Sequence, residues 1–542
     1  MDGVFLGPER LELERRRGIW PNQVISEYLD RWMREKPEAT AIISFREEKG
    51  STTRLSWRQL GEAAGRIAAG LAARGVGKGD FVSFQLPNCW QLVAVHLACV
   101  RLGAVSNPLM PIFRMREMGF IVKHAESKVL IVPGSFRGFD HAALARELKA
   151  QLPNLRHVIV IDGEGEDSFD AAFGTIEAGG DGGISSGTAL GPNDVMQMLF
   201  TSGTTGESKG VLHTSNTLLS LVLQFVKRMQ LSEREVFFMP SPLAHQAGFA
   251  YGLTMAAVLG APIVLLDIWN AARAVELMEA HQATLTFAAT PFLADLANFP
   301  GVEQRKLDAF RLFVTSGAPI PPVLVDLAQK QLHATVIASW GMTECCSATT
   351  TLLSGHKVLE SDGCAVPGAE VRIVEADGSE APRGEAGALK YRGASLFVGY
   401  LKRPHLYAVD EDGWFNTGDI ARMDEEGYIR ICGREKDIII RGGENIPVVE
   451  VESAIYKLPQ VSEVAIVAMP DPRMQERACA FVTLRPGQDL SFEQLKAHLA
   501  SEGVSKPFWP ERLEIIDHMP WTPTGKIQKF VLRDIAKALS VA

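Results

Sequence analysis

The chain has 542 residues, of which 46% are hydrophobic and 22% charged, which is typical of a globular protein with two or more domains. The formal net charge of −9 argues against a general nucleic-acid binder, and we expect no nucleic-acid partner. Seven cysteines without a C-x-x-C pair argue against a disulfide framework or a zinc site.

The beginning of the chain lacks the cationic and apolar segments of a secretory signal, so we expect a cytoplasmic protein. The apolar region Leu92–Val105 is interrupted by His96 and Arg101 and is too short to cross a bilayer. It predicts a buried helix, and no transmembrane segment is expected. A homodimer is compatible with the sequence.

The first part of the chain alternates between helix and strand patterns. An amphipathic helix is predicted from Ser56 to Arg74, with Ser56 as its N-cap, and a strand over Phe81–Leu86. Apolar runs at Val129–Val132 and Val158–Ile161 continue this alternation, which indicates a layered α/β domain.

A loop rich in glycine and hydroxyl groups, T-S-G-T-T-G-E-S-K-G, spans Thr201–Gly210 after an apolar run. Its glycines permit positive φ, so that backbone N–H groups can converge on a polyphosphate. The candidate phosphate-binding residues are Thr201, Ser202, Gly203, Thr204, Thr205, Gly206 and Lys209. Helical spacing from Leu218 onward predicts the order strand, loop, helix, with an anion near the helix start. A Walker loop is excluded because Gly210 follows the lysine.

Later apolar runs end in polar or Gly/Pro loops. Four of these loops are Pro240–His245, Thr290–Pro291, Thr315–Pro319 and Ser339–Glu344. Because ligands of parallel α/β sheets bind beyond the carboxyl ends of the strands, we expect these loops to meet beside Thr201–Lys209.

The pattern changes after Leu352 to short strands separated by Asp-Gly and Glu-Gly turns, which predicts an antiparallel β module. A small α+β unit follows Gly433. Its predicted elements are helices at Val448–Leu458, Phe492–Leu499 and Phe530–Leu539 and strands at Val464–Val467 and Cys479–Thr483.

One loop has groups that suit a phosphate bound together with a divalent cation. Glu344 is the one carboxylate in Ser339–Glu344 and suits Mg²⁺, while the neighbouring Thr343 can donate to a phosphate.

Several motifs resemble, in the same order, those of the adenylate-forming superfamily of acyl-CoA synthetases, carrier-loading adenylation domains and luciferases. They are T-S-G-T-T-G-E-S-K-G at 201–210, S-W-G-M-T-E at 339–344, W-F-N-T-G-D at 414–419, G-R-E-K-D at 433–437 and P-W-T-P-T-G-K-I at 520–527. Ser208 stands where the family usually has proline, and Trp521 where arginine is frequent. The resemblance covers essentially the whole chain and is greatest to ligases for medium-chain fatty acids and alicyclic acids such as cyclohexanecarboxylate.

The resemblance implies roles for individual residues. Thr343 would contact the phosphate, Glu344 would bind Mg²⁺, and Asp419 and Arg434 would contact the ribose. The adenine would lie among Gly317, Ala318, Pro319, Ser339, Trp340 and Gly341. Lys526 would be the mobile catalytic cation that bridges the substrate carboxylate and the α-phosphate. Gly442 and Gly443 would line the tunnel for the pantetheine of coenzyme A, and Lys436 would be the hinge.

The expected fold is therefore a large N-terminal layered α/β domain with a terminal β module over residues 1–433, and a small mobile C-terminal α+β domain over residues 434–542. The expected activity is ATP- and Mg²⁺-dependent formation of an acyl-CoA thioester through an acyl-adenylate, with a small carboxylic acid, ATP and coenzyme A as substrates. Transfer to a carrier protein, a luciferase-type reaction and a non-catalytic ligand-binding relative are the alternatives.

The expected acyl pocket includes His245, Phe249, Gly341 and Cys346. The resembling loop, Ser241–Gly252, contains no Lys or Arg that could pair with a second carboxylate. An apolar monocarboxylic acid is therefore favoured.

Overall fold

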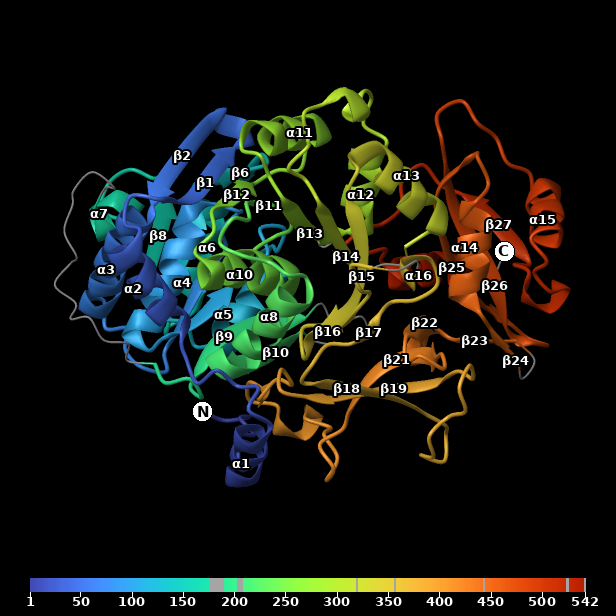
Figure 1. Ribbon diagram of the computed structural model, residues 1–542, viewed down its shortest axis with the longest axis horizontal. Coiled ribbons are helices and arrows are strands. Elements are labelled where there is room, and N and C mark those ends of the chain that lie inside the picture. Colours follow the sequence, from blue (N-terminus) through green and yellow to red (C-terminus); the bar gives the residue numbers. More distant parts are fainter. Residues whose placement is uncertain are drawn as a thin grey trace.

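The computed structural model describes residues 1–174, 190–201, 208–317, 320–354, 357–441, 444–522 and 526–540. The helices of the large N-terminal domain are α1 (Pro8–Arg17), α2 (Ile25–Glu35), α3 (Trp57–Ala73), α4 (Trp90–Leu102), α5 (Met115–His124), α6 (His141–Gln151), α7 (Phe169–Phe173), α8 (Ser215–Arg228), α9 (Gln246–Gly248), α10 (Met255–Leu259), α11 (Ala271–Ala280), α12 (Thr290–Ala297) and α13 (Pro322–Leu332). Figure 1 shows most of these helices packed around two large sheets, whereas α1 projects beside β18 (Ala369–Val374), with Arg17 paired to Glu370 at 2.8 Å.

The first large sheet has the strand order β17-β16-β15-β14-β13-β11-β12-β1-β2. Its strands are β1 (Thr40–Arg46), β2 (Ser51–Ser56), β11 (Phe237–Met239), β12 (Ile263–Leu266), β13 (Leu285–Ala289), β14 (Leu312–Ser316), β15 (Thr335–Met342), β16 (Cys346–Thr350) and β17 (Cys364–Ala365). Its central strands are parallel, and antiparallel strands lie at both edges.

The second large sheet has the order β20-β10-β9-β4-β3-β5-β8. Its strands are β3 (Phe81–Phe84), β4 (Val105–Pro108), β5 (Val129–Pro133), β8 (His157–Ile161), β9 (Val195–Thr201), β10 (Lys209–Thr214) and β20 (Gly399–Tyr400). A small hairpin of β6 (Ser135–Phe136) and β7 (Phe139–Asp140) lies outside both sheets.

Successive side chains along the strands point to opposite faces, so each of the two large sheets is packed on both faces. Phe237 and Phe287 of the first sheet and Val82 and Ile131 of the second share one core with α3, α4 and α8, whereas Phe313 faces a separate core with α11 to α13. Helices α5 and α6 cover the far face of the second sheet. The layers are therefore helix, sheet, helix, sheet, helix, which confirms the predicted layered α/β domain.

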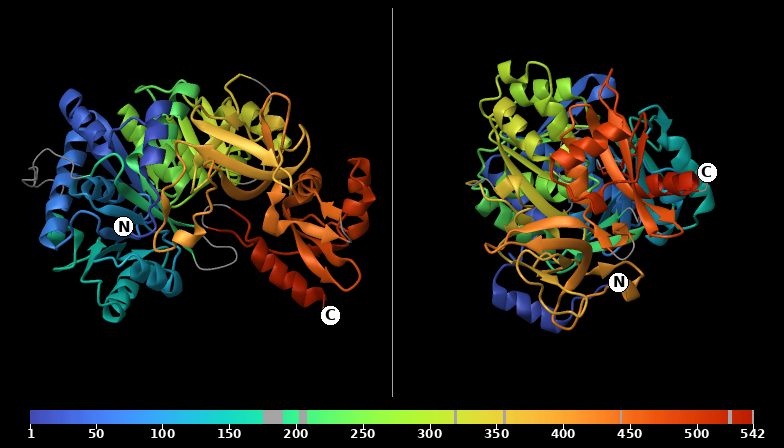
Figure 2. Two further views of the ribbon diagram at one scale, coloured as in Figure 1. Left: turned by 90° about the horizontal axis from the view of Figure 1, so that it is seen from below. Right: turned by 90° about the vertical axis from the view of Figure 1, so that its right-hand side faces the viewer.

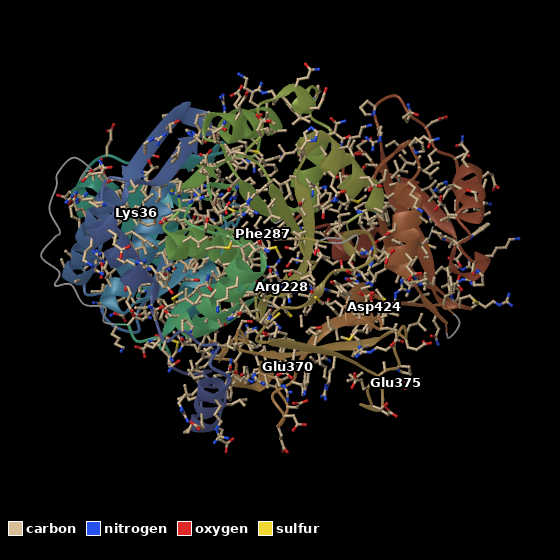
Figure 3. The ribbon with its side chains drawn as sticks, viewed as in Figure 1. Lys36, Arg228, Phe287, Glu370, Glu375 and Asp424 are labelled. Atoms are coloured by element: carbon tan, nitrogen blue, oxygen red, sulfur yellow. The ribbon has the colours of Figure 1, made fainter. Side chains whose placement is uncertain are left out.

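The terminal β module is an antiparallel sheet with the order β18-β19-β21-β22. Its strands are β18 (Ala369–Val374), β19 (Gly387–Gly393), β21 (Phe415–Met423) and β22 (Ile429–Arg434). Arg228 at the end of α8 (labelled in Figure 3) donates to the Cys364 carbonyl at 3.0 Å and the Ala365 carbonyl at 2.7 Å. The middle helical layer is thus tied to the edge strand that leads into the module.

The C-terminal domain is the predicted small α+β unit. Its elements are β23 (Ile439–Arg441), β24 (Glu444–Ile446), α14 (Val448–Tyr456), β25 (Val461–Asp471), β26 (Gln475–Leu484), α15 (Phe492–Ser501), β27 (Arg512–Ile515) and α16 (Lys529–Ser540). It lies at one end of the long axis, with α14 beside β22 (Figures 1 and 2). Arg422 of β21 and Glu450 of α14 form an ion pair at 2.9 Å between the module and this domain.

Two predictions about local structure are wrong. Strand β10 follows the phosphate loop and pairs antiparallel with β9, so no helix begins directly after Lys209; the long-range pairing of β10 with β20 favours the strand. Ser339–Met342 is the second half of β15 rather than a loop, because it pairs with β16 in a hairpin. No helix among the described residues is both long and apolar enough to span a bilayer.

Candidate active site

The candidate site is built around the tight turn between β15 and β16, which carries Glu344. A side chain on Gly341 would collide with the carbonyl oxygen of Cys346, so glycine is required where the two strands approach. Cys346 itself has a φ of 56°, in the left-handed region that non-glycine residues seldom adopt. The Phe397 N–H donates to the Glu344 carbonyl at 2.8 Å, and a ring nitrogen of His213 is hydrogen-bonded to the Thr343 carbonyl at 2.7 Å.

Glu344 is buried and contacts a residue that the sequence analysis did not identify. The Tyr400 hydroxyl donates to Oε1 of Glu344 at 2.8 Å. The Lys209 ammonium lies 3.4 Å from the same hydroxyl and 4.7 Å from the centre of the Tyr400 ring. Lys209 begins β10 and pairs with Thr201, the last residue of β9, so the two ends of the predicted phosphate loop are held together, with Lys209 beside Tyr400.

A second carboxylate, that of Asp419 on β21, is buried beside the same hairpin. The Trp340 indole N–H donates to Asp419 Oδ2 at 2.9 Å, and Arg434 Nε lies 2.9 Å from Oδ1. Both partners were predicted at the nucleotide. A buried carboxylate needs hydrogen bonds and a counter-charge, and these two contacts supply them.

Lys526 reaches this group from the C-terminal domain. A Cβ added to Gly317, whose φ is 87°, would lie 3.2 Å from Lys526 Cε. Burial and the nearby charge of Arg434 lower the pKa of Lys526 to about 8, while Asp419 and Glu344 act in the opposite direction. The two cations and the two carboxylates are therefore close enough to influence one another.

The base of the Lys526 loop is held by hydrogen bonds within the C-terminal domain. Thr522 N–H donates to the Lys526 carbonyl at 2.6 Å, and Lys526 N–H donates to the Thr522 hydroxyl at 2.9 Å. Trp521 pairs with Ile527 across this base, and its indole N–H donates to Glu463 Oε1 at 3.0 Å. Trp521 thus anchors the loop to β25, which gives a structural reason for a residue that the sequence alone left unexplained.

The predicted acyl-pocket residues surround the other side of the β15–β16 turn. Burial and the charge of Lys526 lower the pKa of His245 to about 3, so its imidazole is neutral. The Gln246 side-chain amide donates to Cys346 Sγ at 3.2 Å. The fully buried Phe249 packs against the His96 ring, with centroids 4.6 Å apart.

The floor of this region is aromatic. Tyr251 stacks on Phe287 (labelled in Figure 3) with ring centroids 4.6 Å apart, and its hydroxyl accepts from the Ser347 N–H at 2.9 Å. Phe225 of α8 lies 5.1 Å from Tyr251, centroid to centroid. The three aromatic side chains of this floor are uncharged, and Lys526 is the charged group that acts on His245.

Several predicted site residues cannot be placed. Those that lie outside the described residues are Ser202, Gly203, Thr204, Thr205, Gly206, Ala318, Pro319, Gly442 and Gly443. The predicted hinge residue Lys436 lies in a short 3₁₀ turn, Glu435–Asp437, and its side chain is not described. Ser339 is buried, and its hydroxyl donates to the Thr349 carbonyl at 3.0 Å rather than pointing at a ligand.

The residues of the site fit a divalent cation that is bound mainly by water and by the phosphates of a substrate. In the part of the chain that the structure describes, no group of three or more His, Cys, Asp or Glu side chains could hold a metal ion. Glu344 supplies one carboxylate, and its hydrogen bond from Tyr400 fixes the orientation of that group. Mg²⁺ is typically bound in this way, by one or two carboxylates together with water and substrate phosphates.

Known proteins are similar to this chain along nearly its whole length. The medium-chain fatty-acid–CoA ligase of Escherichia coli (strain K12) is 34% identical over 538 residues, which cover 98% of this chain and 94% of the relative. The 3-[(3aS,4S,7aS)-7a-methyl-1,5-dioxo-octahydro-1H-inden-4-yl]propanoyl:CoA ligase of Rhodococcus jostii (strain RHA1) is 30% identical, with 94% and 98% coverage. The crystal structure of ATP-bound MatB from Rhodopseudomonas palustris is 27% identical and superposes with a TM-score of 0.85, covering 96% of this chain and 100% of MatB.

Two family models match in the order of the two domains. The model described as "AMP-binding enzyme C-terminal domain" matches residues 450–526. The model described as "AMP-binding enzyme" matches residues 29–401, more than half of the sequence. On this match, and on the two relatives, the chain belongs to the AMP-binding enzyme family.

Proposed function

We propose that the protein is an AMP-forming acid–CoA ligase that converts an apolar monocarboxylic acid to its CoA thioester. The observation that carries the proposal is the convergence of Glu344, Asp419 and Arg434 with Lys526, which comes from the other domain. A site that only held a ligand would not need a cation brought in from a second domain beside two buried carboxylates. The two CoA ligases among the relatives support this assignment.

In the first half-reaction a carboxylate oxygen of the acid attacks the α-phosphorus of ATP. The bond from that phosphorus to the bridging oxygen of the β-phosphate breaks, and pyrophosphate leaves with its electron pair. Lys526 would stabilise the negative charge that grows on the α-phosphate, and Thr343 would donate to it. Mg²⁺ on Glu344 would offset the charge of the triphosphate and of the leaving pyrophosphate.

The nucleotide would lie along the rim that the strand ends form. Lys209 and Thr201 would hold the phosphates together with Ser202, Gly203, Thr204, Thr205 and Gly206. Asp419 would accept hydrogen bonds from the ribose hydroxyls, with Arg434 beside it. Ser339, Trp340, Gly341, Gly317, Ala318 and Pro319 would surround the adenine.

In the second half-reaction the thiolate of coenzyme A attacks the acyl carbon, and AMP leaves. Lys526 and the Gly442–Gly443 loop belong to one domain, and both cannot face the α-phosphate together. We therefore expect residues 434–542 to turn relative to residues 1–433 about Lys436, where a few junction residues absorb the change in φ and ψ.

The acid is proposed to be a medium-chain fatty acid or an alicyclic acid. Neutral His245, the buried Phe249 and Cys346 and the half-buried Gly341 offer an apolar surface beside the reacting carboxylate. The E. coli relative is named for medium-chain fatty acids and the R. jostii relative for a bicyclic propanoyl compound. We place the reaction in the cytoplasm, where ATP and coenzyme A are available, and a homodimer stays an untested prediction.

Lys526→Ala and Gly443→Leu should impair different half-reactions. Lys526→Ala should lower acyl-adenylate formation by about 100-fold or more, because one electrostatic donor to the transition state is lost. It should spare thioester formation from supplied acyl-adenylate, whereas Gly443→Leu should do the reverse. Pyrophosphate exchange and single-turnover thioester formation measure the two steps separately. Equal losses in both steps for both variants would contradict the domain turn.

The basic limb of the pH profile should report Lys526. Its pKa of about 8 in the free enzyme means that the ammonium is charged below this pH and is lost above it. We expect kcat/KM for ATP in pyrophosphate exchange to fall as the pH rises through about 8. Lys526→Arg should be slower but should lack this limb, since guanidinium stays charged. An unchanged limb in that variant would assign it to another group.

Trp521→Ala should loosen the loop that carries Lys526. We expect acyl-adenylate formation to fall by about tenfold through misplacement of the ammonium, with thioester formation from supplied acyl-adenylate retained. Trp521→Phe, which keeps the packing but loses the hydrogen bond to Glu463, should be intermediate. Circular dichroism checks that both variants fold. Pyrophosphate exchange at the wild-type rate in Trp521→Ala would contradict the anchoring role of Trp521.

A panel of acids tests the substrate class and the acceptor together. We expect octanoate and cyclohexanecarboxylate to release AMP faster than succinate, because no Lys or Arg of Ser241–Gly252 can pair with a second carboxylate. Turnover should require coenzyme A. A preference for succinate would refute the apolar pocket, and turnover with a carrier protein but not with coenzyme A would favour the carrier-loading alternative.

A further inference from the structure

Tyr400 lies between two oppositely charged side chains that come from different sheets. Its hydroxyl donates to Glu344 Oε1 at 2.8 Å, and the Lys209 ammonium lies 3.4 Å from the same oxygen and 4.7 Å from the ring centre. Glu344 belongs to the hairpin of the first sheet, and Lys209 to β10 of the second. Tyr400 is 1% exposed and Glu344 is buried, whereas Lys209 is half-buried.

The main chain fixes Tyr400 firmly. Strand β20 pairs with β10 through Tyr400 and Val211, and Leu401 N–H donates to the Gly210 carbonyl at 3.0 Å. Gly399 has a φ of 137°, and a Cβ there would collide with the Gly3 carbonyl. The first residues of the chain therefore brace β20 from the other side, and the ring has a set position relative to the phosphate loop.

The phenol is the only uncharged member of this group. A phenol is uncharged at neutral pH, and its hydroxyl donates to the Glu344 carboxylate at 2.8 Å. Opposite charges at this depth attract strongly because the surroundings have a low dielectric constant. Within the described residues, however, Lys209 and Glu344 form no ion pair with each other, since the phenol stands between them.

We infer that Tyr400 is a positioning residue that keeps Lys209 and Glu344 apart, leaving the ammonium free for the triphosphate and the carboxylate oriented for the divalent cation. The inference rests on the proposed function. Without the hydroxyl, Lys209 would become the nearest donor to Glu344, and binding of Mg²⁺ and ATP would first have to break a buried ion pair.

Tyr400→Phe removes the hydroxyl and keeps the ring. Calorimetric titration of ATP without any acid, at limiting and at saturating Mg²⁺, measures binding without turnover. We expect the Kd of ATP at limiting Mg²⁺ to rise roughly tenfold, the size expected for a lost hydrogen bond to a charged group. Thioester formation from supplied acyl-adenylate should stay at the wild-type rate, because it needs no triphosphate.

Tyr407→Phe is the matched control. Tyr407 packs on the same Phe397 ring, at 5.1 Å against 4.7 Å for Tyr400, centroid to centroid, but its hydroxyl contacts Arg10 rather than Glu344. This variant should bind ATP and Mg²⁺ like the wild type. An equal loss in both variants would mean that Tyr400 serves only packing and would overturn the inference.

A double-mutant cycle tests whether the effect passes through Glu344. Glu344→Asp shortens the side chain and withdraws the carboxylate from the phenol, so Tyr400→Phe should add little to it. A full additional loss in the double variant, or unchanged ATP binding in Tyr400→Phe alone, would overturn the inference. If wild-type protein forms acyl-adenylate and Tyr400→Phe binds ATP normally, only the positioning role fails. If the wild type forms no acyl-adenylate with any acid, the proposed function fails as well.

Discussion

The carboxylate of Asp419 is buried, and the Trp340 indole and the Arg434 guanidinium hold its two oxygens. A buried charge that loses a partner costs about 3–5 kcal/mol, so these three residues constrain one another. They come from the hairpin of the first sheet, from the β module and from the last residue of β22, where the chain turns toward the C-terminal domain. These contacts therefore fix the start of the C-terminal domain next to the strand ends of the N-terminal domain. Lys526 belongs to the domain that starts there.

The charges at this rim nearly balance. Lys526 and Arg434 face Asp419 and Glu344, and Lys209 lies behind Tyr400. A triphosphate carries more negative charge than these cations can offset, which is a physical reason for a divalent cation beside Glu344. The neutral His245 and the aromatic floor of Tyr251 and Phe287 add no charge on the acyl side. Under the proposed function, discrimination between acids would depend on shape and burial, whereas binding of the nucleotide would depend on electrostatics.

The local pattern of apolar and polar residues was enough to predict much of the fold. Strands such as β12 and β13 and helices such as α3 are marked by runs or faces of apolar residues that are buried. The local pattern was insufficient for β10 and the end of β15, because these short segments adjoin motifs that resemble loops. Strand β10 is held by pairing with the remote β20, and the end of β15 by its hairpin with β16. The site followed the same rule. Glu344, Asp419, Arg434 and Lys526 lie in recognisable motifs, and the structure brings them together. Tyr400, His213 and the anchoring role of Trp521 depend on contacts between residues remote in sequence, which no short motif contains.

Strand β1, near the start of the chain, pairs with β12 as well as with β2, through Ile42 and Ile263 among others. The second edge of β1 therefore cannot pair until the chain has been made as far as residue 266, about 220 residues after β1. At typical synthesis rates this takes on the order of ten seconds or more, during which the β1–β2 hairpin keeps an unpaired edge with apolar side chains. Such edges invite pairing with other chains. A nascent chain of this architecture thus has a built-in interval of exposure to chaperones, set by the order of its strands and not by its catalytic residues.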